Sequence, residues 1–469
     1  MLIIIPLVLF VSAQARDLPR VLILTGNGNL PTYREGYPPW IHEFQNEKVI
    51  DILRNTAIVD TTQDLSVLTA DRLSAYDLVI SNSIFLEPNA GQLKALYDFV
   101  ANGKSYFTIH CGLLSLLNWD RYEEFIGGIF IGGPSTVPPR FRVVTSNVEF
   151  WGYQYSFRKN KDEHPVSKVV DDFETKDELY YFQPSTPDFH VIARAENLPI
   201  MWWHPVGKGK VMTLTLGHDL EAKNNPGYQQ LLQNGVKWLT GAPVIHGIPP
   251  KLISTRRLHY KNIMSLKALG TNTPEEIEFK LEKNHNPELF VAETSTDGKI
   301  SLQLKGKPGT GQFTVSARKR GGYISYRTYE IKIEEDGHGN IAAYHGNSAK
   351  ASSFENATLF DAVNVMDGDP STRWSSAAVD TTWISLDLQK NYPLRKIVLH
   401  WEASYAKAYS VETSTDGKSW SKLIMVTAGD GEKDVFEFET KTCRYIRIVG
   451  TKRASSRWGY SLYEVELYQ

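Results

Sequence analysis

The chain has few cysteines. Cys111 and Cys443 are the only two in 469 residues, and they fall in regions that we read as different domains. A disulfide framework of the kind that holds small secreted domains together is therefore excluded. Each domain must be stabilised by a hydrophobic core, and the chain is long enough to bury several.

An excess of one charge is also missing. The 51 basic and 53 acidic residues give a formal net charge of −2 at pH 7, without a long run of either sign. Proteins that bind nucleic acid or an anionic membrane surface carry clustered Lys and Arg. We therefore expect neither nucleic acid nor a membrane surface as a partner.

Long hydrophobic runs are absent except at the N-terminus. Residues 1–11 are mostly apolar and lead into Ala13-Gln14-Ala15, which is the pattern of a signal peptide, here residues 1–15, cleaved after Ala15. The run is too short for a permanent membrane span, no cysteine follows it to carry a lipid, and a positively charged start is missing. A buried first strand is the alternative. We expect a secreted protein, periplasmic or extracellular.

Changes in the spacing of apolar residues and in Gly and Pro content along the chain predict three domains after this segment. Residues 18–243 alternate short apolar strands with helical spacing, which predicts an α/β domain with a largely parallel sheet. After a connector rich in Gly and Pro, residues 244–336 show short alternating strands and are expected to form a β-sandwich, immunoglobulin-like by fold analogy. Residues 345–469 follow a second linker and are expected to form another all-β sandwich.

Polar residues at strand ends are the candidate site of the first domain, because ligands of α/β sheets bind beyond the carboxyl ends of the strands. Histidine is the usual acid–base group near neutral pH and a common metal ligand. The candidates are His110, the Asp177-Glu178 pair, His204 in a predicted hairpin, and His218 before Asp219.

His110-Cys111-Gly112 lies between a predicted strand and an apolar helix. This is the strand–turn–helix elbow that exposes a nucleophile in hydrolases and amidotransferases. A nucleophilic cysteine needs a lowered pKa, and adjacent residues at a strand end usually point apart. We expect Cys111 to be a small buried residue, with thiol chemistry as the weaker alternative.

The same region resembles the ThuA-like (trehalose utilisation) family, a branch of the class I glutamine amidotransferase-like fold. The matching stretches, in family order, are 109–112, 125–130, 164–166, 176–180, 202–211, 216–219 and 235–239. The resemblance implies a flavodoxin-like parallel sheet, a histidine at the elbow, and glycosides or 3-keto glycosides as the substrate type. It limits the functional residues to His110, Glu178, His204 and His218.

In an enzyme, we expect His110 and His218 to form an acid–base pair. Glu178 and His204 would orient them or hold a divalent metal. The chain departs from the family in two places, however, because residues 26–34 and 131–134 lack histidines that members often carry. Tyr33, Arg34 and His42 are the residues that could replace them.

Residues 362–374 place two carboxylates and a hydroxyl in one tight turn, at Asp367, Asp369 and Thr372. Closely spaced hard oxygen ligands suit calcium, which takes 6–8 of them. A solvated turn with an Asx cap is the alternative. We expect a structural calcium that fixes this loop.

That turn, together with 383–388, 409–420 and 459–468, resembles the discoidin domain (coagulation factor 5/8 type C) over about residues 345–469. The resemblance implies a jelly-roll sandwich that binds an oligo- or polysaccharide, with Glu464 as the closing calcium ligand. Sugar recognition needs an aromatic face and planar polar side chains. The candidates for it are Trp401, Tyr405, Arg453, Arg457 and Trp458.

Two functions from different classes follow from this organisation. One is a secreted carbohydrate-active enzyme, in which the α/β domain acts on a glycoside or keto-sugar and the terminal module binds the glycan. The other is a non-catalytic glycan-capture protein with a degenerate α/β domain, which the two missing family histidines motivate.

Overall fold

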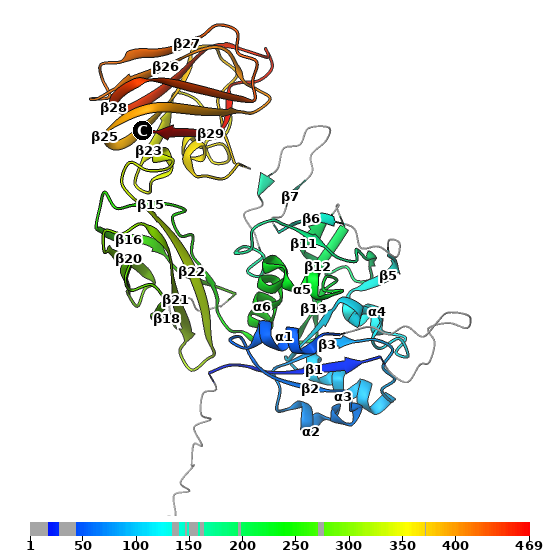
Figure 1. Ribbon diagram of the computed structural model, residues 1–469. Helices are drawn as coiled ribbons and strands as arrows, with labels where there is room; N and C mark the ends of the chain where they lie inside the picture. The colour runs from blue at the N-terminus through cyan, green and yellow to red at the C-terminus, as the bar shows by residue number, and fades with distance from the viewer. Residues whose placement is uncertain are drawn as a thin grey trace, which may run out of the picture.

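The computed structural model describes residues 17–27, 44–133, 140–145, 148–149, 158–159, 164–195, 198–270, 276–370 and 372–469. Within these ranges an N-terminal α/β domain precedes two all-β domains (Figure 1). The expected signal peptide lies outside them. In the ranges that are described, no helix combines the length and apolar character needed to cross a membrane.

The α/β domain is built on a nine-stranded sheet of order β2-β1-β3-β4-β13-β12-β11-β6-β9. The first five strands are parallel and the other four are antiparallel. In sheet order, their bounds are β2 (Ile58–Thr62), β1 (Arg20–Gly26), β3 (Leu78–Ser83), β4 (Ser105–Ile109), β13 (Gly209–Leu214), β12 (Leu198–Val206), β11 (His190–Ala195), β6 (Arg140–Val144) and β9 (Phe173–Lys176). The smaller pairs are β5 (Gly128–Gly132) with β10 (Tyr181–Pro184), and β7 (Val148–Glu149) with β8 (Arg158–Lys159).

Helices pack on both faces of this sheet. In β1, Val21 and Ile23 belong to one core, and Leu22 and Leu24 to the other, because successive strand residues point to opposite faces. The first core contains residues of α1 (Asn46–Leu53) and α6 (Pro226–Thr240). The second contains residues of α2 (Ala70–Leu73), α3 (Ala90–Ala101) and α4 (Tyr122–Ile126). The remaining elements are α5 (Leu220–Asn224), η1 (Leu65–Val67) and η2 (His110–Leu114).

The sequence sets the limits of α6 clearly. Asn225 caps its first turn by accepting from the N–H of Gly227, and Pro226 stands where no intrahelical donor is needed. Gly241 ends the helix in the left-handed conformation, at φ 76°. This helix therefore has a defined length and presents fixed faces.

The second domain consists of a four-stranded sheet, β15-β22-β21-β18, and a three-stranded sheet, β16-β20-β19. The two sheets share one hydrophobic core, which is the two-layer arrangement expected from the alternating pattern. The bounds are β14 (Val244–His246), β15 (Ile253–Ser254), β16 (His259–Ser265), β17 (Lys267–Leu269), β18 (Ile277–Asn284), β19 (Phe290–Thr294), β20 (Lys299–Leu304), β21 (Gly309–Lys319) and β22 (Ile324–Glu334).

The third domain is a seven-stranded antiparallel sheet that runs β24-β29-β25-β28-β26-β27, with β23 paired to β25. Register shifts in the long β25–β28 pair let these strands bend around a core that contains Trp374 and Trp401. The bounds are β23 (Ser348–Ala351), β24 (Trp374–Ser375), β25 (Thr382–Trp401), β26 (Ala406–Ser414), β27 (Ser421–Val426), β28 (Lys433–Arg453), β29 (Ser461–Tyr468), η4 (Ile341–Ala343) and η5 (Ala362–Met366).

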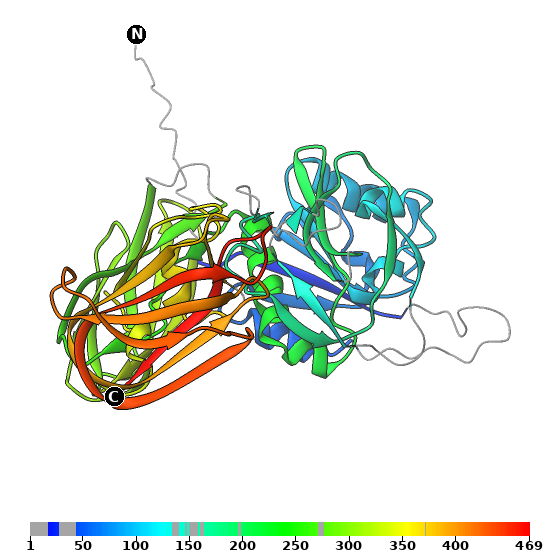
Figure 2. The ribbon, with the colours of Figure 1, turned by 90° about the horizontal axis from the view of Figure 1, so that it is seen from above.

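The two β domains lie together on one side of the α/β domain (Figure 2). Arg327 of β22 donates to the carbonyls of Ile245 and Val169, at 2.9 and 3.2 Å. Arg256 donates to the carbonyls of His345 and Leu388, at 3.0 and 2.8 Å. Side chains of the second domain thus bind backbone on both sides, beyond the covalent connectors.

Candidate functional site

The candidate site forms where β4 and β13 end. These strands are parallel neighbours with Ile109 opposite Leu214, so the residues that follow them emerge at the same level. His110 comes directly after β4 and has φ 44°, a left-handed conformation that costs roughly 1–2 kcal/mol in a residue other than glycine. Its Nδ1–H donates to the carbonyl of Thr215, 2.9 Å away, which leaves Nε2 without a proton in the neutral ring.

Two side-chain atoms, from His218 and Glu178, form a triangle with this nitrogen. His110 Nε2 lies 3.2 Å from His218 Nδ1 and 3.4 Å from Glu178 Oε2. The third side of the triangle, from His218 Nδ1 to Glu178 Oε2, measures 3.2 Å. The imidazole of His110 is 1% exposed, whereas Glu178 and His218 are 24% and 31% exposed. The cluster is thus anchored in the core and reaches solvent through its other two members.

The charges of Glu178 and His218 support each other. Burial favours a higher pKa for Glu178, but its contacts with the imidazoles of His110 and His218 outweigh burial and hold the pKa far below its usual value. The contact with Glu178 raises the pKa of His218. Glu178 is therefore ionised at neutral pH, and its negative charge attracts a cation to this position.

Asp177 fixes the two loops that carry this cluster. Its carboxylate accepts from the backbone N–H of Gly217 at 2.7 Å, of His218 at 3.0 Å and of Glu178 at 2.8 Å. The side chain is 1% exposed, and burial raises its pKa despite these bonds. The sequence pointed to the Asp177-Glu178 pair. Only the structure shows that Asp177 holds the two loops in place and that Glu178 faces the site.

Two further residues of the site carried no clear sequence signal. The ring of Tyr180 stacks on His110 at 4.8 Å between centroids, and its hydroxyl lies 3.1 Å from His110 Nε2. Burial raises the pKa of Tyr180 well above its usual value, so it keeps its proton. Lys223 of α5 is buried, and its ammonium donates to the carbonyl of Gly217. Burial lowers the pKa of Lys223 to about 8.

His204 is not part of the cluster, which corrects the expectation that it orients the site or binds its metal. It lies inside β12 opposite Val211, three residues before β13 ends. Because β12 runs antiparallel to β13, residues late in β12 lie beside the early part of β13. His204 is therefore displaced from the strand ends that carry the cluster. His204 Nε2 donates to the carbonyl of Phe125 at 2.9 Å, and the residue is 3% exposed. It therefore lies within the sheet, away from the His110 cluster.

Cys111 is a buried core residue. It is 0% exposed and packs with Ile84, Phe85 and Leu114. Burial raises the pKa of its thiol to about 12, the opposite of what a nucleophilic cysteine requires. Tyr33, Arg34 and His42, the possible replacements for the missing histidines, lie outside the described residues.

The expected calcium ligands gather at the end of η5 and on β29. Thr372 Oγ1 donates to Asp367 Oδ2 at 2.8 Å, and the backbone N–H of Asp369 donates to Asp367 Oδ1 at 2.8 Å. Glu464 is 7% exposed and lies beside the carboxylate of Asp367. Burial and the Asp367 carboxylate raise the pKa of Glu464 to about 8. Glu464 is the buried member of this group, whereas the Asp369 side chain is 39% exposed and lies 3.7 Å from the ammonium of Lys251.

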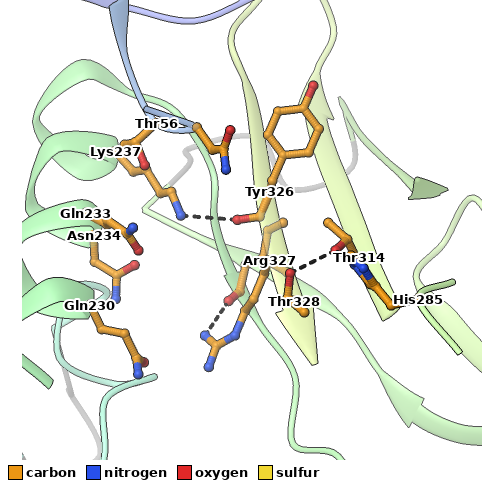
Figure 3. A pocket seen from close by; sticks show the side chains of 12 residues that line it. Thr56, Gln230, Gln233, Asn234, Lys237, His285, Thr314, Tyr326, Arg327 and Thr328 are labelled. Carbon is orange, nitrogen blue, oxygen red and sulfur yellow. Dashed lines mark hydrogen bonds between the residues drawn. The ribbon is translucent and has the colours of Figure 1, made fainter. Parts of the chain in front are cut away.

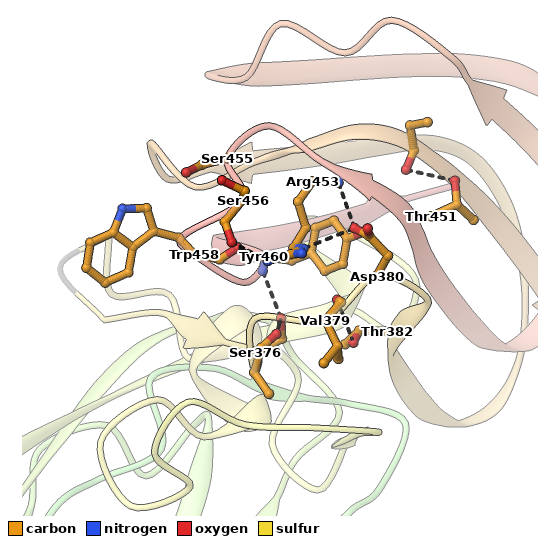
Figure 4. Close-up of polar contacts among 12 residues, drawn as sticks. Ser376, Val379, Asp380, Thr382, Thr451, Arg453, Ser455, Ser456, Trp458 and Tyr460 are labelled. Atoms are coloured by element: carbon orange, nitrogen blue, oxygen red, sulfur yellow. Dashed lines mark hydrogen bonds and ion pairs between the residues drawn. The ribbon is translucent and has the colours of Figure 1, made fainter.

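The candidate sugar-binding residues of the third domain divide into two groups. Trp458 is 40% exposed, and its ring points away from the other residues of its loop (Figure 4). Arg453 holds that loop, since its guanidinium pairs with Asp380 at 3.0 Å and donates to the carbonyls of Ser456 and Trp458 at 3.1 Å. Arg457, which precedes Trp458 in the chain, is also exposed.

Trp401 and Tyr405 differ from this exposed pair. Trp401 is 5% exposed in the core, and its indole N–H donates to Asp434 at 2.8 Å. It has no open ring face, which corrects its assignment as a sugar contact. Tyr405 is half-buried and packs against the same core.

Two family models match the chain. Residues 20–239 match ThuA, trehalose utilisation, and residues 348–465 match the F5/8 type C domain. None of the curated proteins compared with the chain matches it.

Solved structures similar to the third domain include carbohydrate-binding modules. Chitosan-binding module 1 of a chitosanase/glucanase from Paenibacillus sp. IK-5 is 38% identical over 28% of this chain and 100% of its own, with a TM-score of 0.27. Module 2 of that enzyme, in complex with chitotriose, is 33% identical over 28% and 100%, with a TM-score of 0.26. The Clostridium perfringens module CpGH89CBM32-5, in complex with GalNAc-β-1,3-galactose, is 18% identical over 26% and 95%, with a TM-score of 0.25. This protein therefore contains a ThuA domain over residues 20–239, followed by an F5/8 type C domain over residues 348–465.

Proposed function

We propose that this protein is an exported carbohydrate-active enzyme. Its ThuA domain would use a divalent metal to act on a glycoside or keto-sugar, and its F5/8 type C domain would bind the surrounding glycan. The observation that carries the proposal is the convergence of His110 Nε2, Glu178 Oε2 and His218 Nδ1 within 3.4 Å of one another. The strand order β2-β1-β3-β4-β13 supports a flavodoxin-like assignment for the parallel half of the sheet.

The three residues fit a metal. Ligand atoms about 2.0–2.1 Å from a tetrahedral zinc lie about 3.3–3.4 Å apart, and the three distances here are 3.2, 3.2 and 3.4 Å. His110 donates its other ring N–H to a carbonyl, the arrangement that orients metal-binding histidines in general. Such a metal would polarise a sugar oxygen or lower the pKa of a bound water.

The chain's own groups would then bind and orient the sugar. Tyr180 keeps its hydroxyl proton because burial raises its pKa, so it can donate to a sugar oxygen next to His110. Asp177 holds the turn at Gly217 and His218 in place. Lys223 holds the same turn from the other side through the carbonyl of Gly217.

The test measures metal content and turnover in parallel. We expect the purified protein to bind one zinc or manganese ion per chain and to act on a panel of glycosides and 3-keto glycosides. His110→Ala and Glu178→Gln should lose both properties, whereas His259→Ala, at an exposed position of β16, should keep both. Unchanged turnover in His110→Ala would refute the catalytic site. No turnover across the panel, with glycan binding intact, would favour the glycan-capture protein instead.

Glycan binding by the third domain rests on Arg457 and Trp458. Both side chains are exposed, and an indole and a guanidinium supply the apolar face and the planar donors that a sugar needs. We expect a calcium ion at Asp367, Asp369, Thr372 and Glu464 to fix the turn after η5. The assay is calorimetric titration with oligosaccharides, including chitotriose, the ligand of one similar module. Trp458→Ala should abolish binding, and Met425→Ala, at a 63% exposed position of the same domain, should not.

A further inference from the structure

A polar cavity of about 570 Å³ lies between the α/β domain and the second domain. Helix α6 forms one wall and strands β21 and β22 form the other (Figure 3). This volume falls within the range of small-molecule sites in proteins, about 300–1,000 Å³. None of its lining residues belongs to the His110 cluster or to the F5/8 type C domain, so the proposed function leaves the cavity unexplained.

The sequence places polar groups on both walls. Gln230, Gln233, Asn234 and Lys237 recur at the spacing of one helix face and line the cavity. Residues on that face of a surface helix are normally polar because they meet water, but here they meet a second domain. Across from them, the side chains of Thr314 and Thr328 form a cross-strand hydrogen bond of 2.8 Å on the outer face of the sandwich.

The charged side chains around the cavity include cations and no carboxylate. Lys237 and Arg327 both line it, and neither forms an ion pair within the part of the chain that the structure describes. Lys237 is 7% exposed, and its one hydrogen bond there runs to the carbonyl of Tyr326 at 3.3 Å. Burial, and then the charge of Arg327, lower the pKa of Lys237 to about 8. A buried ammonium without a counter-charge is costly, and an anion in the cavity would relieve that cost.

Both cations keep donors for such an anion. An ammonium has three N–H donors and a guanidinium has five. The hydrogen bonds given above use one donor of Lys237 and two of Arg327, all directed at backbone carbonyls. The amides of the helix wall and the hydroxyls of the strand wall both donate and accept, which matches the hydroxyl groups of a sugar ring better than it matches a bare inorganic ion.

We propose that this interdomain cavity binds a small anionic saccharide, a monosaccharide that carries a carboxylate or a sulfate. Lys237 and Arg327 hold the acid group, and the amide and threonine side chains hold the ring hydroxyls. The bound sugar touches α6 and β22 together, so it also stabilises the docking of the second domain on the first. This site is independent of the metal cluster and of the surface around Trp458.

The test titrates the full-length protein with D-glucuronate, D-glucose 6-sulfate, D-glucose and inorganic sulfate, in a Trp458→Ala background that removes the other sugar surface. We expect at least one anionic sugar to bind at least about tenfold more tightly than glucose and than sulfate, because hydrogen bonds to charged groups are the strong ones. Whichever anionic sugar binds distinguishes a carboxylate from a sulfate as the recognised group.

Two variants and one control locate the binding. Lys237→Met should weaken it about tenfold or more, and Thr328→Val, at an exposed strand position that keeps both cations, should weaken it less. Lys307→Met, at an exposed position away from the cavity lining, should leave it unchanged. Binding of neither sugar acid, or binding that both cavity variants leave intact, would overturn the proposal. Sulfate that binds as tightly as the sugars would reduce the cavity to an ion site and overturn its saccharide part.

Discussion

Glu464→Gln should change the stability of the F5/8 type C domain in opposite directions with and without calcium. Glu464 is buried on β29, and Asp367 is its acidic neighbour. A neutral glutamine of the same shape removes the like-charge repulsion. It also removes a ligand that a calcium ion at this turn would need.

The magnitude follows from the pKa of Glu464, which rises from 4.5 to about 8 on folding. A carboxyl with a raised pKa binds its proton more tightly in the folded state, so metal-free stability falls as pH rises from 4.5 to 8. At pH 7, about 2.5 pH units above the ordinary pKa, the free energy of unfolding has fallen by about 1.36 kcal/mol for each unit, or about 3 kcal/mol in total. Without calcium, Glu464→Gln should therefore be more stable than the natural chain by up to about 3 kcal/mol.

Calcium should reverse this order. A ligand at 1,000 times its Kd stabilises the state that binds it by about 4.1 kcal/mol, which exceeds the roughly 3 kcal/mol deficit of the metal-free natural chain, and only the natural chain should gain this. Calorimetric melting of both proteins at pH 7, in EGTA and in calcium, measures the effect, and Glu437→Gln on β28 is the exposed control. A natural chain that melts alike in both buffers, or a glutamine variant that gains as much from calcium, would refute the reasoning.

Three further outcomes test the rest of the structure. Asp177→Asn should weaken metal binding about 10–100-fold while the domain stays folded, which titration with zinc and circular dichroism measure together. His204→Leu should leave metal affinity unchanged and lower the free energy of unfolding by about 1–3 kcal/mol, because the Phe125 carbonyl loses its buried donor. The pKa of Asp77 is lowered because hydrogen bonds to Lys104 and the Arg20 N–H outweigh its burial. Asp77→Asn should therefore destabilise the protein near neutral pH, and denaturant titrations should show the difference fading as acid protonates Asp77 below its lowered pKa.

The sequence alone was sufficient for features that depend on neighbouring residues. The apolar run that ends before His110 predicted a strand and its end, and β4 does end at Ile109. Such patterns are local, because side-chain period and chain-terminating residues act within a few positions. The order of a ThuA domain and an F5/8 type C domain was expected from the resemblance of short motifs to these families, and it is confirmed.

Only the tertiary structure decided which strand-end residues meet. His110 contacts His218 across 108 positions and Tyr180 across 70, and those contacts depend on which strands are neighbours and in which direction they run. His204 was excluded from the His110 cluster because β12 is antiparallel to β13. Trp401 was excluded from the sugar-binding residues because its side chain faces the hydrophobic core. The cavity beside Lys237 likewise exists only because the second domain covers a helix face that is polar enough to meet water. Pairing, direction and docking are set by the packing of distant segments, which residue spacing along the chain does not encode.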